Sequence, residues 1–302
     1  MRAVGTWCTI LYLGSNDAPP VKLVYLVGAG RSGSTTLGVA LDNVPGVFNS
    51  GELFAWFLFR GKPSSNRKET VDLWRSVGQR VPELERFHGS RFHRHLEHHS
   101  SLLKPTRWFS AKDRAEYHEA NAALLRAIAE VTDDHVLVDT SHYPLRLSNL
   151  LALDGVDVHA LYLVRDPRSV INALRKTVQR DRPMHPVKAN IYCWIVALLS
   201  ELVLLRVPAR RKLRIRYEDF VERPAQQVER LVRQLGLPEG LPSAEDLSTG
   251  RMFQGNRLRL KEEISISRQP SKQQLSRAWT VMSTILLAPL LLLYGYGLRW
   301  KP

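Results

Sequence analysis

Three glycines, one arginine and a run of hydroxyl side chains follow a short apolar segment near the start of the chain. Residues 23–27 are apolar and rich in β-formers, which favours a buried strand. Gly28, Gly30 and Gly33 come next, and residues 34–41 have the apolar spacing of a helix. Glycine lets an anion approach main-chain N–H groups, and a helix N-terminus supplies further free donors. This order predicts a phosphate-binding loop.

The glycine spacing is that of the front half of a nucleoside-triphosphatase P-loop, in which Lys and then Ser or Thr follow the last glycine. Here Ser34 stands at the lysine position, and the positive charge lies inside the loop at Arg31. No partner strand ends in a convincing magnesium-binding Asp. The sequence therefore predicts anion binding without the usual triphosphatase apparatus, and a nucleotide kinase-like phosphotransferase stays open as the alternative function.

Residues 31–35, R-S-G-S-T, resemble the 5′-phosphosulfate loop of sulfotransferases that use 3′-phosphoadenosine 5′-phosphosulfate (PAPS). The arginine form is similar to the carbohydrate, tyrosylprotein and bacterial branches of that family. The resemblance implies an α/β fold, with a parallel sheet flanked by helices and a helical cap insertion. It also implies PAPS as the sulfuryl donor, with no metal, and a catalytic Arg31 that stabilises charge on the leaving oxygen. The donor-binding residues implied here are Gly30, Arg31, Ser32, Gly33, Ser34, Thr35 and Thr36.

Arg165 follows a second apolar run, residues 159–164, and precedes a helix start at Pro167. The segment resembles the family's 3′-phosphate loop, and an arginine there can pair bidentately with a phosphate. Family members usually have Ser at the position of Ala173, so this sequence lacks one of the groups that the resemblance implies for the 3′-phosphate, and another residue can compensate. Arg168, Asn172 and a later loop are the candidates.

Two later segments complete the resemblance. Tyr217 lies in a Tyr-Glu-Asp segment whose family counterpart packs near the adenine, although a tyrosine that only fills the core fits equally well. A Gly-Asn-x-x-Arg-like stretch closes over the nucleotide in bacterial members, and we expect one of its arginines to reach the 3′-phosphate. A basic surface loop is the alternative. The residues of that stretch are Gly255, Asn256, Arg257 and Arg259.

Two residues are candidates for the catalytic base. Glu52 ends a predicted strand, residues 47–52, and resembles the Gly-Glu that supplies the base in tyrosylprotein and several bacterial sulfotransferases. A solvated strand-end carboxylate is the alternative. His142 follows the apolar strand 136–139 and stands where relatives have Lys; it titrates near neutrality when unperturbed, so it fits a base or a hydrogen-bond donor. A histidine that caps the following helix is equally compatible.

Residues 60–133 match no family segment and are expected to form a mostly helical cap over the acceptor site. Five histidines lie in this polar tract, and we expect them on a solvated face, because no cysteine or carboxylate pattern completes a metal site. They are His88, His93, His95, His98 and His99.

Composition limits the remaining choices. The net charge of +14 over 302 residues favours acidic partners, but no recognised nucleic-acid motif accompanies it. Two cysteines give no disulfide framework, so a reducing, cytoplasmic location is expected.

Residues 1–20 are read as a lead segment and 21–302 as one sulfotransferase domain. Residues 278–298 carry no charge, and a terminal helix packed on the core is favoured over a membrane span, with a peripheral membrane contact left open. The acceptor is expected to be a small molecule, carbohydrate or glycolipid.

Overall fold

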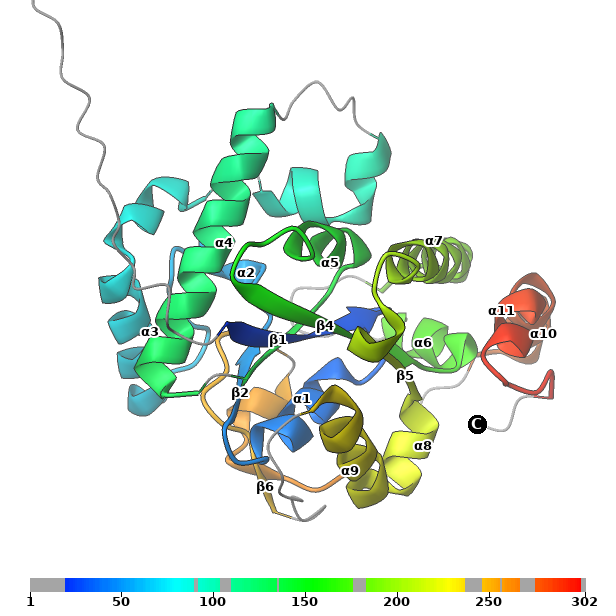
Figure 1. The fold of residues 1–302 in the computed structure, drawn as a ribbon. Helices are drawn as coiled ribbons and strands as arrows, with labels where there is room; N and C mark the ends of the chain where they lie inside the picture. Colours follow the sequence, from blue (N-terminus) through cyan, green and yellow to red (C-terminus); the bar gives the residue numbers. More distant parts are fainter. Residues whose placement is uncertain are drawn as a thin grey trace, which may run out of the picture.

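The fold is built on five parallel strands in the order β2-β3-β1-β4-β5 (Figure 1). The computed structural model describes residues 20–89, 92–103, 110–134, 136–175, 183–236, 246–255, 257–266 and 275–299, with only the backbone described for Leu103, Arg257 and Arg259. The predicted lead segment lies outside the described residues except for Pro20. The five strands are β1 (Val21–Gly28), β2 (Val47–Gly51), β3 (Val136–His142), β4 (Val156–Val164) and β5 (Lys212–Arg216).

Side chains of β1 alternate between two separate cores. Leu23 and Tyr25 belong to the core on one face of the sheet, and Val24 and Leu26 belong to the core on the other. Both faces are covered, which is why β1 reads as a continuous apolar run instead of alternating with polar residues.

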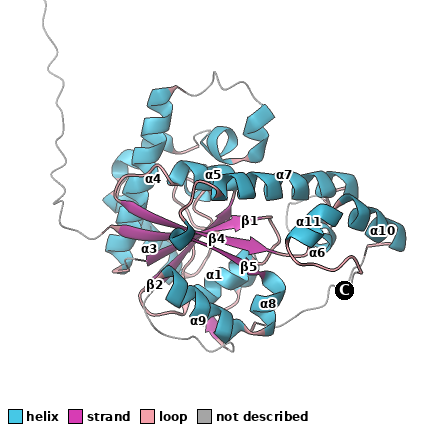
Figure 2. Cartoon of the chain, turned by 45° about the vertical axis from the view of Figure 1, so that its right-hand side comes forward, coloured by secondary structure: helices cyan, strands magenta, loops and turns pink. Residues whose placement is uncertain are grey.

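Helices cover both faces of the sheet, as predicted (Figure 2). One face carries α1 (Ser34–Asp42), α8 (Tyr217–Glu222) and α9 (Pro224–Leu235), together with the small hairpin β6 (Leu247–Ser248) and β7 (Glu263–Ile264). The other face carries α2 (Ala55–Leu58), α3 (Lys68–Arg80), α4 (Ala111–Thr132), α5 (Pro144–Leu150), α6 (Pro167–Leu174), α7 (Pro186–Leu204) and α11 (Ala288–Leu293), with α10 (Arg277–Leu286) beside α7. The short turns are η1 (Pro82–Phe87), η2 (His93–Glu97), η3 (His99–Leu103), η5 (Ala209–Arg211) and η6 (Arg257–Leu260).

Two predicted elements differ from the observed ones. The sequence predicts a fifth strand in residues 213–220 that runs into a turn; in the structure this strand, β5, ends at Arg216, and Tyr217 begins helix α8. The uncharged C-terminal stretch packs on the core as expected, but as two short helices. Pro289 explains the break, because proline lacks an N–H donor and its ring clashes with the carbonyl four residues earlier.

Helix α7 is long and apolar enough to cross a membrane by length and composition, although much of it is buried inside the protein. Its inner side, which includes Cys193 and Ala197, packs on the core. It is therefore a core helix in this fold.

Candidate functional site

The glycine loop joins β1 to α1 through a turn with unusual backbone angles. The Ser32 N–H donates to the Ala29 carbonyl at 3.2 Å, and Arg31 and Gly33 have φ of 69° and 100°. Arg31 thus holds a left-handed conformation that a bulky residue seldom adopts, a kind of strain that clusters at binding sites. Within the described part of the chain no side chain caps the N-terminus of α1, so its first N–H groups are available to an anion.

Arg165 and Tyr217 lie against this loop. Arg165 Nη1 donates to the Arg31 carbonyl at 2.9 Å, and its guanidinium lies 4.5 Å from the centre of the Tyr217 ring. The ring in turn contacts Gly33 so closely that a Cβ at that position would overlap it. Glycine is therefore required at position 33 both by its φ and by its neighbour. The structure brings together the ends of β1, β4 and β5, as the carboxyl ends of parallel strands require.

Arg168 does not take the place of the missing serine. It is buried in an ion pair with Asp166, at 2.7 Å, and also donates to the carbonyls of Gly297 and Leu298. Its guanidinium fastens the C-terminal segment to α6, so this one of the three candidates is wrong.

The late loop reaches the glycine loop at Gly255. A Cβ on Gly255 would lie 3.7 Å from the Thr35 methyl carbon, which places the loop beside the start of α1. Asn256 lies outside the described residues, as do the side chains of Arg257 and Arg259, so the reach expected of these arginines stays a prediction.

Glu52 lies directly beyond β2, on the same edge of the sheet. Its N–H donates to the Gln254 carbonyl at 2.9 Å, and Gly51 before it has a φ of 76° that suits glycine. The next residues are tied to β3, because the Phe54 N–H donates to the Ser141 hydroxyl at 3.1 Å. The partly exposed Glu52 therefore stands between the late loop and the end of β3.

His142 ends β3 beside Gly30. A Cβ on Gly30 would lie 3.5 Å from His142 Nε2 and 3.1 Å from the Tyr192 hydroxyl, so a side chain at this position would crowd the Tyr192 hydroxyl. The imidazole stacks on Tyr143 with 4.5 Å between ring centres. Burial lowers the pKa of His142 to about 4, and neighbouring imidazoles and Arg31 act in the same direction. The ring is neutral at physiological pH and available to accept a proton.

Tyr192 on α7 is a loop contact that the sequence did not reveal. Its hydroxyl accepts a hydrogen bond from the Gly30 N–H at 2.6 Å. Burial raises the pKa of Tyr192 to about 12, so the hydroxyl keeps its proton. Apolar residues surround it in the sequence, and only the packing of α7 on the loop shows this contact.

A buried ionic network anchors the turn that carries His142. Arg146 on α5 donates through Nε to Asp139 of β3 at 3.0 Å and through Nη1 to Glu97 of η2. Burial raises the pKa of Glu97, but Arg146, His93 and Tyr117 outweigh it and bring the value to about 2. The network fixes η2, which belongs to the predicted cap, against the end of β3.

The histidines of residues 60–133 do not form a solvated face, and that prediction is wrong. His93 is 15% exposed, bonds to Glu97 at 3.0 Å, and lies 4.7 Å from the Tyr143 ring. His98 lies 5.6 Å from the same ring, and His99 lies 5.7 Å from the Tyr192 ring. Imidazole and phenol rings thus wall the space next to Gly30. Among the described residues no group of His, Cys, Asp and Glu side chains is arranged to hold a metal ion.

Comparisons with known proteins agree with this architecture. The model of the sulfotransferase family matches residues 24–240. The sulfotransferase domain from the curacin biosynthetic pathway is 19% identical, with a TM-score of 0.52 over 93% of this chain and 99% of its own. The sulfotransferase domain of the Synechococcus PCC 7002 olefin synthase is 18% identical, with a TM-score of 0.54 over 94% and 98%. Sulfotransferase STF9 from Mycobacterium avium is 14% identical, with a TM-score of 0.53 over 94% and 80%. The search of curated proteins finds no match.

Proposed function

Because the chain belongs to the sulfotransferase family, we propose that it moves a sulfuryl group from PAPS to a hydroxyl or amine of a small-molecule, carbohydrate or glycolipid acceptor. The observation that carries the proposal is the meeting of the glycine loop, Arg165 and the Tyr217 ring. A nucleotide with a phosphate group on each side of its ribose needs two anion sites near an aromatic surface. These three features supply an N–H cradle, a guanidinium and a ring.

The residues present fit such a donor. Within the described part of the chain, Arg165 Nε and the Ser32 hydroxyl are buried without a hydrogen-bond partner, which a bound anion would supply. The open N-terminus of α1 adds N–H donors, and Ser34 and Thr35 add hydroxyls beside it. When bound, PAPS supplies the sulfuryl group. The chain's part is to hold both of its anionic ends and to orient the acceptor.

In the proposed reaction a side chain at the strand ends takes the acceptor's proton. Either the Glu52 carboxylate or Nε2 of His142 accepts it as the acceptor oxygen or nitrogen bonds to sulfur. The sulfur–oxygen bond to the donor phosphate breaks, and its electron pair stays on the phosphate oxygen. Arg31 stabilises the charge that develops there, and positioning with electrostatics provides most of the rate enhancement.

The donor assignment is tested by thermal denaturation with ligands. Adenosine 3′,5′-bisphosphate, the desulfated product, should raise the melting temperature, and ATP with magnesium should raise it much less. Arg165→Ala should remove most of the shift. Arg214→Ala is the matched control, because Arg214 also lies over a tyrosine ring, that of Tyr162 at 5.4 Å, but on an exposed face. Equal shifts with ATP and the bisphosphate would overturn the donor assignment.

The base is tested by single-turnover kinetics after radiolabelled PAPS has identified an acceptor. Removing a general base slows the chemical step by about 10²–10⁴-fold. Glu52→Gln and His142→Ala should differ, with one showing that loss and the other a smaller one. If both variants keep the wild-type rate, neither residue is the base.

A further inference from the structure

The outer side of α7 is apolar and uncovered. Six large side chains follow one another along it at intervals of three and four residues, so they form a single stripe. They are Val187, Ile191, Trp194, Leu198, Leu202 and Leu205. Leu198 is 57% exposed, while the opposite side of the helix packs on the core. A helix with apolar side chains on all sides is normally buried on all sides. Because the stripe is exposed, nothing in the described part of the chain covers it.

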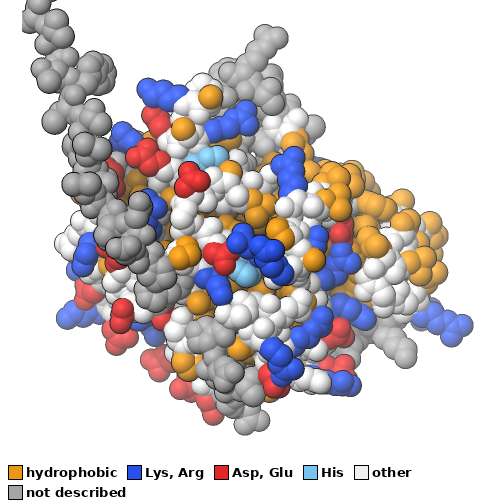
Figure 3. All heavy atoms as spheres, in the orientation of Figure 1, with side chains coloured by type: hydrophobic (Ala, Val, Ile, Leu, Met, Phe, Trp, Pro, Cys, Tyr) orange, Lys and Arg blue, Asp and Glu red, His pale blue; other side chains and the backbone are white. Residues whose placement is uncertain are grey.

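Two neighbouring helices extend this stripe into a broad patch. The Trp194 indole N–H donates to the Leu286 carbonyl at 3.0 Å, and Asn190 donates to the Ser283 hydroxyl at 3.0 Å, so α10 lies alongside α7. The exposed large side chains here are Val281, Ile285, Leu286, Leu292, Leu293 and Leu298. Ile285 alone is 69% exposed. Hydrophobic atoms gather on this side of the molecule in Figure 3. We call these twelve residues the apolar face.

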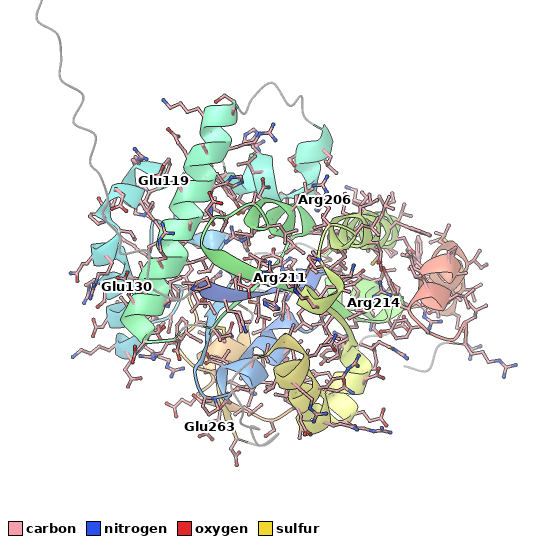
Figure 4. All side chains as sticks on the ribbon, in the orientation of Figure 1. Glu119, Glu130, Arg206, Arg211, Arg214 and Glu263 are labelled. Atoms are coloured by element: carbon pink, nitrogen blue, oxygen red, sulfur yellow. The ribbon has the colours of Figure 1, made fainter. Side chains whose placement is uncertain are left out.

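The segments that form the apolar face are almost free of negative charge. Within residues 183–214 and 275–299 the only acidic residue is Glu201, and it pairs with Arg214 at 2.5 Å. The basic residues of the same segments are Lys188, Arg206, Arg210, Arg211, Lys212, Arg214, Arg277 and Arg299. Figure 4 labels Arg206 and Arg211, which follow α7 in the chain, and Arg214 of β5, and Arg211 pairs with Asp157 at 2.9 Å. The segments that carry the apolar face therefore have an excess of basic residues, which we call its basic rim.

We propose that the apolar face docks on the surface of an anionic lipid bilayer. Aliphatic side chains that enter the acyl boundary, with arginines and lysines beside them at the headgroups, are the pattern of a protein that lies on a membrane without crossing it. A second copy of the chain is a poorer occupant, because each copy carries a net charge of +14 and the rims would repel. Aromatic and methionine side chains, which are enriched in protein interfaces, are also scarce here, with Trp194 the one aromatic residue of the twelve.

The proposal is tested by flotation of the full chain with lipid vesicles. Vesicles of phosphatidylcholine with 30 mol% phosphatidylglycerol should carry the protein, and vesicles of phosphatidylcholine alone should carry at least about tenfold less. Raising the salt from about 0.1 M to 1 M should weaken binding to the anionic vesicles by a similar factor, because the Debye length falls from about 10 to 3 Å. Equal binding to both kinds of vesicle would overturn the role of the rim.

Variants separate the apolar face from net charge. The double substitution Leu198→Gln with Ile285→Gln should lower binding to anionic vesicles at least tenfold, because it removes two apolar side chains from the apolar face. Both side chains are exposed, so their replacement leaves the core intact. Leu58→Gln with Leu102→Gln is the matched control, since these leucines are exposed outside the apolar face, and it should bind as the wild type does. Similar binding by both doubles would overturn the proposal. So would a wild-type dimer, seen by light scattering, that the first double converts to a monomer without any vesicle binding.

A negative result in the vesicle assay would overturn lipid docking and leave the proposed sulfuryl transfer unaffected. The vesicle assay contains no nucleotide, and the melting shift with adenosine 3′,5′-bisphosphate requires no lipid. Both double variants should keep the wild-type shift, because none of the four positions contacts the glycine loop, Arg165 or Tyr217.

Discussion

The two sides of the candidate site are built in different ways. The glycine-loop side consists of main-chain N–H groups, hydroxyls and the guanidinium groups of Arg31 and Arg165, and most of its parts lie within a few residues of a strand end. The side around Tyr143 is assembled from η2, β3, α5 and α7, and a buried ionic network holds it. A short motif can specify a glycine loop, whereas the group of rings around Tyr143, which we call the wall, depends on the whole tertiary structure. The two sides should therefore respond differently to substitution.

The largest expected effect is on the wall. Arg146→Leu leaves Glu97 and Asp139 buried without their cation, and losing one partner of a buried ion pair costs about 3–5 kcal/mol. The free energy of unfolding, measured by urea denaturation, should fall by about that amount. Arg214→Leu breaks the exposed pair with Glu201 and should cost at most about 1 kcal/mol. Equal losses in the two variants would mean that the network does not hold the wall.

On the loop side, Arg31→Ala should affect turnover more than stability or donor binding. Losing one group that stabilises transition-state charge costs about 10²–10³ in kcat. The Kd of adenosine 3′,5′-bisphosphate, measured by calorimetry, should change only a few-fold. Arg31→Lys keeps the charge and should recover part of kcat. A Kd that rises as much as kcat falls would assign Arg31 to binding instead.

The smallest expected effect lies where the two sides meet, at His142. Its pKa is about 4 in the folded protein and near 6.5 in an unfolded chain, so between these values the unfolded chain binds more protons. Stability should therefore fall as pH falls from about 6.5 towards 4.

Urea midpoints at pH 7.5 and 5.0 measure this dependence. His142→Asn should flatten part of it, because asparagine tolerates the φ of 60° and does not titrate there. His185→Asn makes the same replacement at an exposed histidine that caps α7 and is the matched control for the substitution itself. If His142→Asn changes the pH dependence no more than His185→Asn does, His142 titrates normally.

The fold and the position of the glycine loop could be predicted from the sequence because their signals are local. Apolar runs before Gly28 and Arg165 mark buried parallel strands, and the glycines that follow Val27 mark the cradle. The order of these segments was enough to predict the family and the sheet flanked by helices. Strand lengths were less accurate: β3 runs on to His142, because pairing with β1 extends it beyond its apolar residues.

The wall could not be predicted in the same way. Glu97 and Arg146 are 49 residues apart, and no local sequence pattern indicates that they form an ion pair. The histidines from His93 to His99 looked like a polar surface, since sequence composition does not reveal which polar side chains a neighbouring element will cover. The contact of Tyr192 with Gly30 could not be predicted for the same reason, because Tyr192 lies in a largely apolar helix far from the glycine loop in sequence.

The hydroxyl of Tyr192 has a consequence for how the enzyme would be switched on. A ligand that hydrogen-bonds to the Gly30 N–H must displace the Tyr192 hydroxyl. Tyr192 belongs to helix α7, whose outer side carries part of the apolar face. If this displacement shifts α7, ligand binding at the glycine loop and lipid binding at the apolar face are coupled through one helix. Reciprocity would then require each to change the affinity of the other by the same factor.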